Sequence, residues 1–249
     1  MTGRHIPPEI LDYIVDFLQD DPETLKQCCL ISKSWVPRTR KYLFAVVSFY
    51  NPDDIEAWEK AFPDPSNSPA HHTHTLFISY FKAVGTTESA KYGWIQDFSR
   101  VVRFEVEGSI DGDLGICLAP FYNTLKSLRV SSHSIPHSQV VDLMYHLPLL
   151  EDVTLFGFES KLDKPQIIGP PSTSAALTGT LELRLMWGIP RTIRRLLGLP
   201  NGLHFRKLTL FSHGAEGCSV GKLVDACSDS LEYLDVGLGM GGVISFRFI

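Results

Sequence analysis

Three histidines, His71, His72 and His74, are the residues whose type and spacing could most readily bind a metal ion. Imidazole nitrogens are zinc ligands, but a structural zinc site uses about four ligands, and no cysteine or carboxylate stands at ligand spacing beside these three. We therefore expect a polar loop here rather than a metal site, and we expect no metal or other cofactor.

Other chemistry is poorly supported. The run GLGMGG, which begins at Gly237, lacks the Lys-Ser/Thr pair and the following helix of a phosphate-binding loop. Serine, histidine and aspartate are plentiful but fit no nucleophile-elbow frame. Arg191, Arg194 and Arg195 fall on one predicted helix, which is typical of a solvated face. No catalytic constellation emerges, and we predict a protein that is not an enzyme.

Composition narrows the function further. The chain has 249 residues and a net charge of −5, which gives no basic field for nucleic acid or an anionic membrane. No apolar run approaches the ~20 residues that span a bilayer. Pro7, Pro8 and Glu9 interrupt the stretch where a signal peptide would be apolar. The 5 cysteines are odd in number and do not have the spacing of metal ligands. We expect them to be small buried hydrophobic residues in a reducing compartment. We expect a soluble protein of the cytoplasm or nucleus.

Residues near the N-terminus predict an amphipathic helix with an unusually broad apolar side. Pro7, Pro8 and Glu9 suit a first helical turn. With successive residues about 100° apart, the apolar set covers an arc of about 160°, wider than the ~100° stripe that packs on one core. The set is Ile10, Leu11, Ile14, Val15, Phe17 and Leu18.

Two further helical elements follow within the first 45 residues. Asp21 and Pro22 restart a helix, which is predicted to carry LKQCCLISKSW as far as Trp35, with Pro37 ending or kinking it. RKYLF supplies a third short element. Three short helices cannot bury this much apolar surface by themselves, so another surface must cover it.

These residues resemble the F-box. The resemblance rests on Ile6-Pro7-Pro8-Glu9-Ile10-Leu11, on the helix that follows, and on CCLISKSW, which ends at Trp35. It covers roughly residues 5 to 45, and Ile6 stands where leucine is usual.

The resemblance implies docking onto the Skp adaptor of a cullin-RING ubiquitin ligase. The implied adaptor-binding residues are Ile6, Pro7, Ile10, Leu11, Ile14, Leu18, Leu30 and Ile31, with Trp35 bracing the three helices. The alternative is a helical hairpin that only caps the next domain, for which one narrow apolar face would be enough.

From residue 46 a short frame recurs, apolar-x-x-apolar-x-apolar. With the fourth position as marker, the copies fall at Leu76, Phe104, Leu128, Val153, Leu183, Leu208 and Leu234. The differences are 28, 24, 25, 30, 25 and 26, and the register of the copy at Leu183 is uncertain by two residues. Helical or turn-rich stretches lie between the frames, and a Pro/Ser-rich insertion, SKLDKPQIIGPPSTS, lies in the longest gap.

This spacing resembles a degenerate leucine-rich-repeat array, in which units that cannot bury their own apolar faces stack on one another. A run of unrelated βα units is the competing interpretation. The predicted architecture is α/β: an F-box-like helical module over 1–45, then a leucine-rich-repeat-like solenoid with a parallel concave sheet over 46–249. We expect about seven irregular repeats. The C-terminal cap is missing or makeshift: either VISFRFI adds a final strand, or the chain is truncated.

Alternation along each frame sends the third, fifth and seventh positions to the concave face of the sheet. Aromatic and arginine side chains at these positions are the usual anchors of protein interfaces. The predicted target-binding residues are Arg129, Phe156, Arg184, Met186, Phe211 and Tyr233. The alternative is that irregular repeats turn some of them into the core.

The function predicted from these features is a substrate receptor, with the helices on a Skp-type adaptor, and through it a cullin, and the repeats on an unknown protein target. A second hypothesis is a repeat scaffold without a ligase role, whose helices only cap the solenoid. A hydrolase with an unrecognised site is the third.

Overall fold

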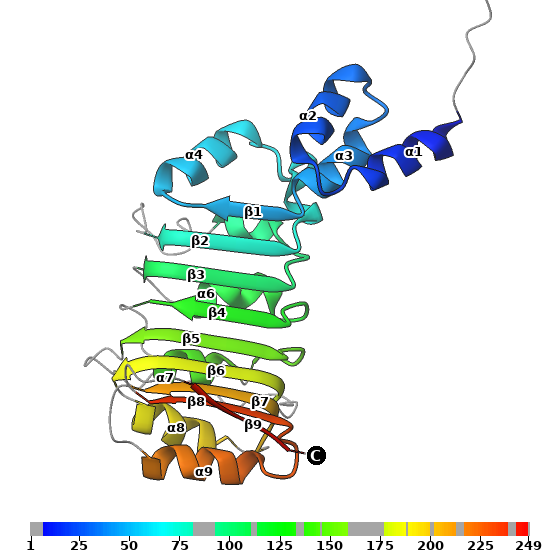
Figure 1. Ribbon diagram of the computed structural model, residues 1–249. Helices are drawn as coiled ribbons and strands as arrows, with labels where there is room; N and C mark the ends of the chain where they lie inside the picture. Colours follow the sequence, from blue (N-terminus) through cyan, green and yellow to red (C-terminus); the bar gives the residue numbers. More distant parts are fainter. Residues whose placement is uncertain are drawn as a thin grey trace, which may run out of the picture.

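The computed structural model describes residues 7–81, 93–110, 114–132, 137–144, 146–158, 177–187, 189–199, 202–212, 217–238 and 243–248. Its architecture is α/β, with an N-terminal helical region followed by a largely parallel sheet of nine strands (Figure 1). The expected α/β class and the N-terminal helices are therefore confirmed.

Three helices form the N-terminal region: α1 (Pro8–Phe17), α2 (Pro22–Ile31) and α3 (Val36–Leu43). Each carries proline in its first turn, where no amide donor is needed. The Asp21 carboxylate accepts a hydrogen bond from the Thr24 amide at 3.1 Å and caps α2.

The second helix is shorter than predicted. It ends at Ile31, Ser32 is extended, and Trp35 stands before α3 rather than at the end of α2. Pro37 explains the difference, because proline fits the first turn of a new helix better than the interior of an old one.

The nine strands follow one another across the sheet in chain order. They are β1 (Val46–Phe49), β2 (Thr75–Phe81), β3 (Arg103–Ile110), β4 (Ser127–Ser131), β5 (Asp152–Phe158), β6 (Leu177–Trp187), β7 (Leu203–Ser212), β8 (Tyr233–Leu238) and β9 (Val243–Arg247). All neighbouring pairs from β1 to β8 are parallel, and β9 pairs antiparallel with β8.

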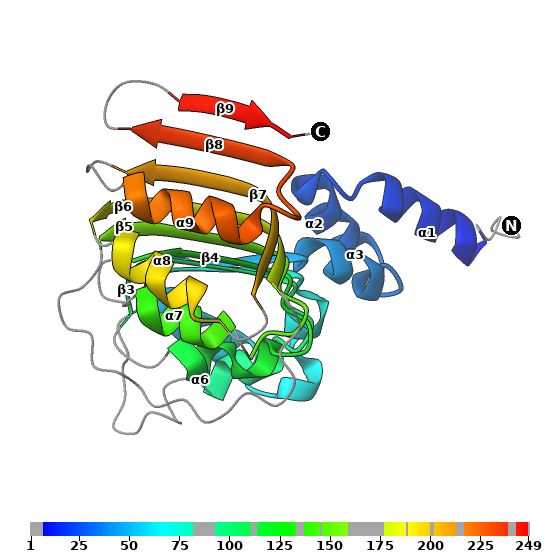
Figure 2. The same cartoon turned by 90° about the horizontal axis from the view of Figure 1, so that it is seen from below.

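Helical segments lie in the crossovers between parallel strands, as such connections usually require. They are α4 (Pro52–Ala61), α6 (Leu114–Leu118), α7 (His137–Met144), α8 (Ile189–Leu197) and α9 (Gly217–Cys227), with short 3₁₀ turns that include Pro69–His72 and Gly93–Asp97. Figure 2 shows α6 to α9 on the same side of the sheet. We call the opposite side of the sheet the open face.

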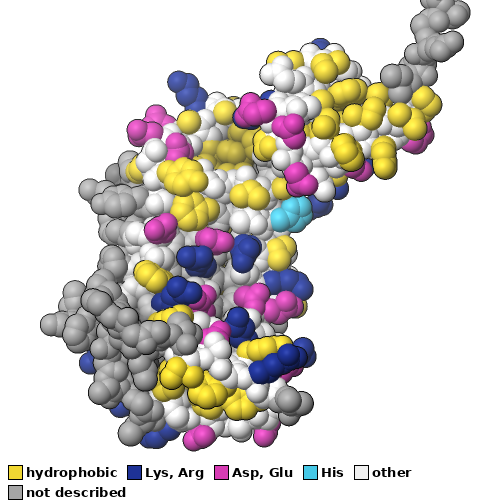
Figure 3. All heavy atoms as spheres, in the orientation of Figure 1, with side chains coloured by type: hydrophobic (Ala, Val, Ile, Leu, Met, Phe, Trp, Pro, Cys, Tyr) yellow, Lys and Arg dark blue, Asp and Glu magenta, His cyan; other side chains and the backbone are white. Residues whose placement is uncertain are grey.

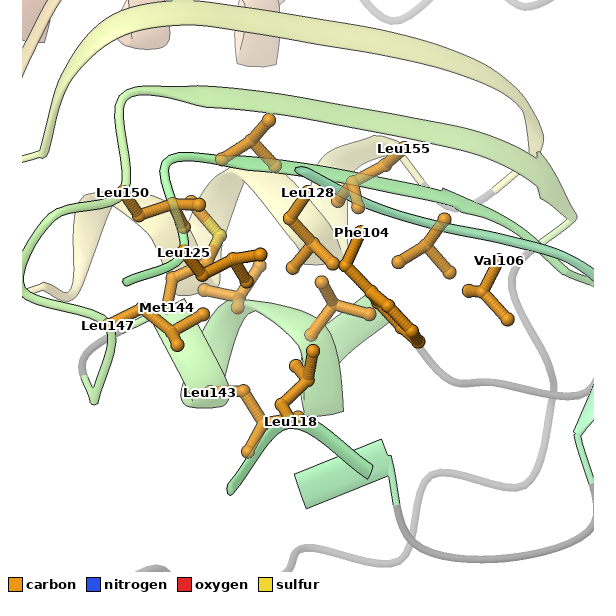
Figure 4. Packing of buried hydrophobic residues seen from close by; sticks show 14 of the residues in the cluster. Phe104, Val106, Leu118, Leu125, Leu128, Leu143, Met144, Leu147, Leu150 and Leu155 are labelled. Carbon is orange, nitrogen blue, oxygen red and sulfur yellow. The ribbon is translucent and has the colours of Figure 1, made fainter. Parts of the chain in front are cut away.

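The hydrophobic core lies between the sheet and these helices. The fourth and sixth frame positions point into it, as Phe104 and Val106 of β3 and Leu128 of β4 show in Figure 4. Leu118 and Met144 meet them from the helical side, and all five side chains are at most 1% exposed. A single strand and its helix could not bury these side chains without the neighbouring strands, so burial and strand pairing depend on each other.

The seven predicted frames fall on β2 to β8, so every one of those strands is confirmed. One register is corrected: Leu181, not Leu183, pairs with Val153 and Leu208. An irregularity in the pairing of β6 with β7 lies between Gly179 and Thr180. Gly179 has a φ of +89°, and a Cβ there would lie 2.2 Å from the Glu151 carbonyl oxygen.

Two elements between the helical region and the first frame were not predicted. β1 has only four residues, too few for a periodic signal, and it follows directly on α3. α4 begins at a capping box in which the Asn51 side chain accepts from the Asp54 amide and the Asp54 side chain accepts from the Asn51 amide. The two capping residues of α4, Asn51 and Asp54, can be read in NPDD, but this stretch lies outside the repeat pattern.

Of the two alternatives for VISFRFI, the structure shows the added strand: β9 pairs along the edge of β8. Its pairing places Ile244 opposite Val236 and Phe246 opposite Leu234, in line with the core-facing rows. Both side chains are about half exposed, since the described helices do not reach over this strand.

Gly179 gives a stability test of this arrangement. Gly179→Ala should lower the free energy of unfolding by more than the ~1–2 kcal/mol of a left-handed non-glycine residue, because the new Cβ also collides with the Glu151 backbone. The matched control is Gly221→Ala in the middle of α9, where a Cβ meets no atom within 4 Å. It should raise stability by about 0.5–1 kcal/mol. Urea unfolding measures both, and equal values for the two variants would contradict the packing at β6.

Candidate protein-interaction surfaces

The helical region exposes a concentrated apolar surface. Six of the fourteen exposed large hydrophobic side chains among the described residues lie between residues 10 and 31. They are Ile10, Tyr13, Ile14 and Phe17 of α1, and Leu30 and Ile31 at the end of α2. Figure 3 shows hydrophobic side chains gathered over this part of the molecule. We call these six residues the outer helical face.

The broad apolar arc of α1 serves two surfaces. At about 100° per residue, Ile10, Ile14 and Phe17 lie on one side of the arc and are exposed, Phe17 by 81%. Val15 lies on the other side and is 1% exposed. Leu11 and Leu18, on the same side as Val15, are half-buried. Part of the arc therefore closes the helical module, and the other part remains uncovered.

The predicted adaptor-binding residues divide in the same way. Pro7, Ile10, Ile14, Leu30 and Ile31 are exposed, Leu11 and Leu18 are half-buried, and Ile6 lies outside the described residues. Tyr13, 72% exposed, joins the outer helical face although the sequence analysis did not single it out. Its position three residues after Ile10 and four before Phe17 was the available signal.

A polar cluster holds α1 against α3 and so sets the direction of the outer helical face. The Arg38 guanidinium donates to both carboxylate oxygens of Asp16, and its Nε–Oδ1 distance is 2.7 Å. Arg38 also contacts Asp12, and the Tyr42 hydroxyl donates to Asp16 Oδ1 at 2.6 Å. A planar guanidinium held by two bonds fixes geometry as well as distance.

A second polar contact, between Cys29 of α2 and Thr39 of α3, joins these two helices. Thr39 is fully buried, and its hydroxyl donates to the Trp35 carbonyl at 2.9 Å. The Cys29 sulfur lies 2.8 Å from the same hydroxyl. Trp35 is the N-cap residue of α3 and its side chain is half-buried, so the bracing role stays a prediction.

The open face carries the third, fifth and seventh frame positions in rows that run across the strands. In one row, Phe156, Arg184, Phe211 and Gly237 are successive partners on β5, β6, β7 and β8. The Arg184 guanidinium lies over the Phe211 ring, 4.7 Å from its centroid, and pairs with Glu182. A Cβ on Gly237 would lie 2.3 Å from Cδ1 of the Phe211 ring, so that ring covers the glycine.

Five of the six predicted target-binding residues can be placed on this face. Arg129 and Arg184 are exposed, Phe156 is 44% exposed, Tyr233 is 39% exposed, and Phe211 is half-buried between Arg184 and Gly237. Met186 lies in β6, but its side chain is outside the described residues. In the corrected register, the third, fifth and seventh frame positions of β6 are Thr180, Glu182 and Arg184. Met186 therefore lies two residues beyond the last of these positions.

The open face is charged but largely neutralised. Arg103 pairs with Glu105 at 3.4 Å, Lys207 with Asp235 at 3.8 Å, and the Arg247 guanidinium lies 5.4 Å from the centre of the Tyr233 ring. Arg129 has no ion pair among the described residues. Figure 3 shows the resulting alternation of acidic and basic side chains across the strands, with apolar groups at both ends of the sheet.

An aromatic pair at the first strands was missed because β1 was missed. Tyr50, which directly follows β1, is 64% exposed, and its ring lies 5.5 Å from that of Phe77 on β2.

The histidine cluster and the arginine-rich helix α8 are accounted for by their local contacts. The rings of His71 and His72 lie 4.0 Å apart, and burial, followed by the nearby His71, lowers the pKa of His72. No cluster of three or more metal-binding side chains occurs in the part of the chain that the structure describes. Arg191 and Arg194 are exposed as predicted, whereas Arg195 of α8 donates to Asp142 of α7 at 2.7 Å and ties the two helices together. Residues 239–242 of the glycine-rich run lie outside the described residues.

Cys28, Cys117 and Cys227 are buried, as expected of small hydrophobic residues. None of the described helices is long and apolar enough to cross a membrane.

Comparison with known proteins adds no relative: no family model, no curated protein and no solved structure matches this chain.

The Asp16 cluster predicts a pH dependence. Hydrogen bonds from Arg38, then Tyr42, lower the pKa of Asp16 from 3.8 to about 2. A lowered folded-state pKa stabilises the fold above the unfolded value, and this contribution is lost as the pH falls from 3.8 through about 2. Asp16→Asn should therefore melt below the wild type at neutral pH, and the difference should shrink over that interval.

The control is Asp20→Asn, because Asp20 is exposed and makes no ion pair or side-chain hydrogen bond among the described residues. Melting curves of the three proteins between pH 7 and pH 2 test the cluster. A gap between wild type and Asp16→Asn that stayed constant with pH would show that the Asp16 charge does not hold α1.

Proposed function

We propose that this chain is the substrate-recognition subunit of a Skp–cullin–F-box ubiquitin ligase. The observation that carries the proposal is the outer helical face: six large apolar side chains in a small helical module, with Phe17 and Leu30 each at least 80% exposed. Soluble proteins rarely expose apolar groups in such concentration unless another protein covers them. The position and residue types agree with the F-box resemblance of the same helices.

The disposition of α1 favours this function over that of a simple cap. A capping hairpin would turn its apolar side toward the sheet that it covers. In this chain the outer helical face is exposed, and α1 extends away from the sheet (Figure 1). The region joins the rest of the protein mainly through α3 and the turn Pro69–His72. The repeat scaffold without a ligase role therefore remains the second candidate, supported by the open face alone.

The junction between the helices and the sheet suits a receptor that must hold its target at a set distance from the ligase. The Ala45 carbonyl accepts hydrogen bonds from the amides of His74 and Thr75 at 2.9 and 3.0 Å. The Thr73 hydroxyl donates to the Phe44 carbonyl at 2.9 Å. Because α3 runs directly into β1, these bonds fasten the helical region to the first strands without a free linker.

In this proposal the sheet and its helices form a leucine-rich-repeat-like solenoid, and its open face binds the target. Support comes from the chain-ordered parallel strands and from the row Phe156–Arg184–Phe211, which sets a cation between two aromatic rings. Exposed aromatic rings beside arginine are the side chains that most often anchor protein interfaces. No catalytic group is assigned to the chain.

Adaptor binding can be tested without disturbing the core. Phe17→Asp combined with Leu30→Asp should abolish co-purification with a Skp-type adaptor, since both side chains point to solvent in the free chain. Each apolar side chain buried in a complex contributes about 1.5–3 kcal/mol, so losing two should weaken binding by at least ~100-fold. The matched control is Phe246→Asp, which alters an exposed aromatic residue on β9. Undiminished adaptor binding by the double variant would reject the ligase function.

Target binding can be tested on the same purified receptor. Phe156→Ala should reduce the yield of ubiquitin-bearing proteins captured from cells with the adaptor-bound receptor, while adaptor binding and melting temperature stay close to wild type. The core comparison is Leu208→Ala, a fully buried side chain on β7 whose loss should cost about 2–5 kcal/mol. If Phe156→Ala destabilised the fold as much as Leu208→Ala, this side chain would belong to the core and not to a binding face.

A further inference from the structure

A groove runs along the outer edge of the sheet, between β1 and α4. Its volume is about 430 Å³, within the ~300–1,000 Å³ of most ligand sites. It is lined by the end of α3, the backbone and side chains of β1, and one side of α4 that presents Asp54, Ala57, Trp58 and Ala61. Figure 3 shows a hollow with apolar walls in this part of the molecule. Neither the outer helical face nor the frame positions of the open face include it.

The floor of the groove is a strand edge with free hydrogen-bonding groups. In the described part of the chain β1 pairs with β2 alone, and the Ala45 carbonyl accepts from the amides of His74 and Thr75. Since amide and carbonyl groups alternate sides along a strand, Ala45, Val47 and Phe49 face β2, whereas Val46 and Ser48 face the groove. The structure gives the main-chain groups of Val46 and Ser48 no partner among the described residues.

The free stretch of edge has a defined end. The amides of Tyr50 and Asn51 both donate to Asp54 Oδ2, at 2.8 and 3.1 Å. These bonds belong to the capping box of α4, so the edge beyond Ser48 is already occupied. An added strand can therefore pair with Val46 and Ser48 and must stop at the first turn of α4.

The wall opposite the edge leaves room for side chains. Ala57 and Ala61 are exposed and lie one turn apart on α4, while Trp58 anchors the helix by packing its ring 5.7 Å from Phe49 and 5.3 Å from Phe98. The rings of Phe44 and Phe62 also line the groove and lie 5.9 Å apart, so they fill its end beside α3. The small side chains of Ala57 and Ala61 leave space along the rest of the helix. A strand on this edge would direct alternate side chains toward these alanines.

The negative charge of α4 favours a basic residue at one end of the bound segment. The helix carries four acidic residues and one basic residue, Lys60. Asp53 is exposed, stands where the free edge stops, and has no ion pair among the described residues. A lysine or arginine that reaches this end of the groove would find an unpaired carboxylate.

We propose that this groove binds an extended segment of another protein as an additional strand on β1. The segment carries apolar side chains at alternate positions, directed between β1 and α4, and a lysine or arginine beside Asp53. Strand addition supplies main-chain hydrogen bonds for affinity and side-chain pockets for specificity. The site is separate from the adaptor and target surfaces and does not depend on the proposed function.

The test uses random hexapeptides displayed on phage, selected on the full chain and then synthesised for fluorescence polarisation. Selected peptides should show apolar alternation with a terminal lysine or arginine. Ala57→Trp, which fills the groove from an exposed helical position, should weaken their binding at least tenfold. Glu56→Trp adds the same side chain at an exposed position of α4 that does not line the groove, and should leave binding unchanged. Both variants should melt as the wild type does.

Backbone modification separates strand addition from other modes. Methylating the peptide amides at one alternate set of positions should abolish binding, and at the other set should not, because only one set faces β1. Asp53→Lys should favour peptides with glutamate in place of the terminal lysine.

Four results would overturn the proposal. Three of them are selection of no alternating peptide, binding that persists in Ala57→Trp, and equal effects of methylation at both sets. A dimer of the chain that Ala57→Trp dissolves would identify a second copy as the occupant and would also overturn it.

Discussion

Parallel pairing in a common register is the constraint on which most of this structure depends. Along β2 to β8, the fourth frame position of each strand stands beside the fourth position of the next, from Leu76 and Phe104 to Leu208 and Leu234. A slip of one residue would send these side chains to water and the charged rows into the core. Burial on the helical side and neutralised charge on the open face are thus two results of the same pairing.

The register also decides which side chains on the open face become neighbours. Phe156, Arg184 and Phe211 come from three strands and are separated by more than twenty residues each, yet they form one row. The position of the Phe211 ring requires glycine at position 237 on the next strand. Small departures from regular pairing, such as that at Gly179, adjust the row without breaking it.

The helical region depends on the sheet in a different way. Its own polar cluster, centred on Asp16 and Arg38, orients α1 against α3, and α3 continues into β1. The strand that receives the helices is also the edge strand, so one end of the sheet brings together the outer helical face, the β1–α4 groove and the first residues of the open face. The segment Ala45–Phe49, which is hydrogen-bonded to β2, connects these surfaces along the chain.

The sequence by itself determined the elements with strong periodicity. Seven frames spaced about 25 residues apart identified β2 to β8, and the proline and capping signals identified the starts of α1 and α2, because local patterns of burial repeat at the period of the backbone. Alternation also sufficed to put Arg129, Phe156 and Tyr233 on the open face. Only the tertiary structure decided the rest. The register of β6 and the split of the α1 arc between Val15 and Phe17 depend on contacts between residues distant in the chain, which no local period encodes. The four-residue strand β1 is too short for a local period to identify.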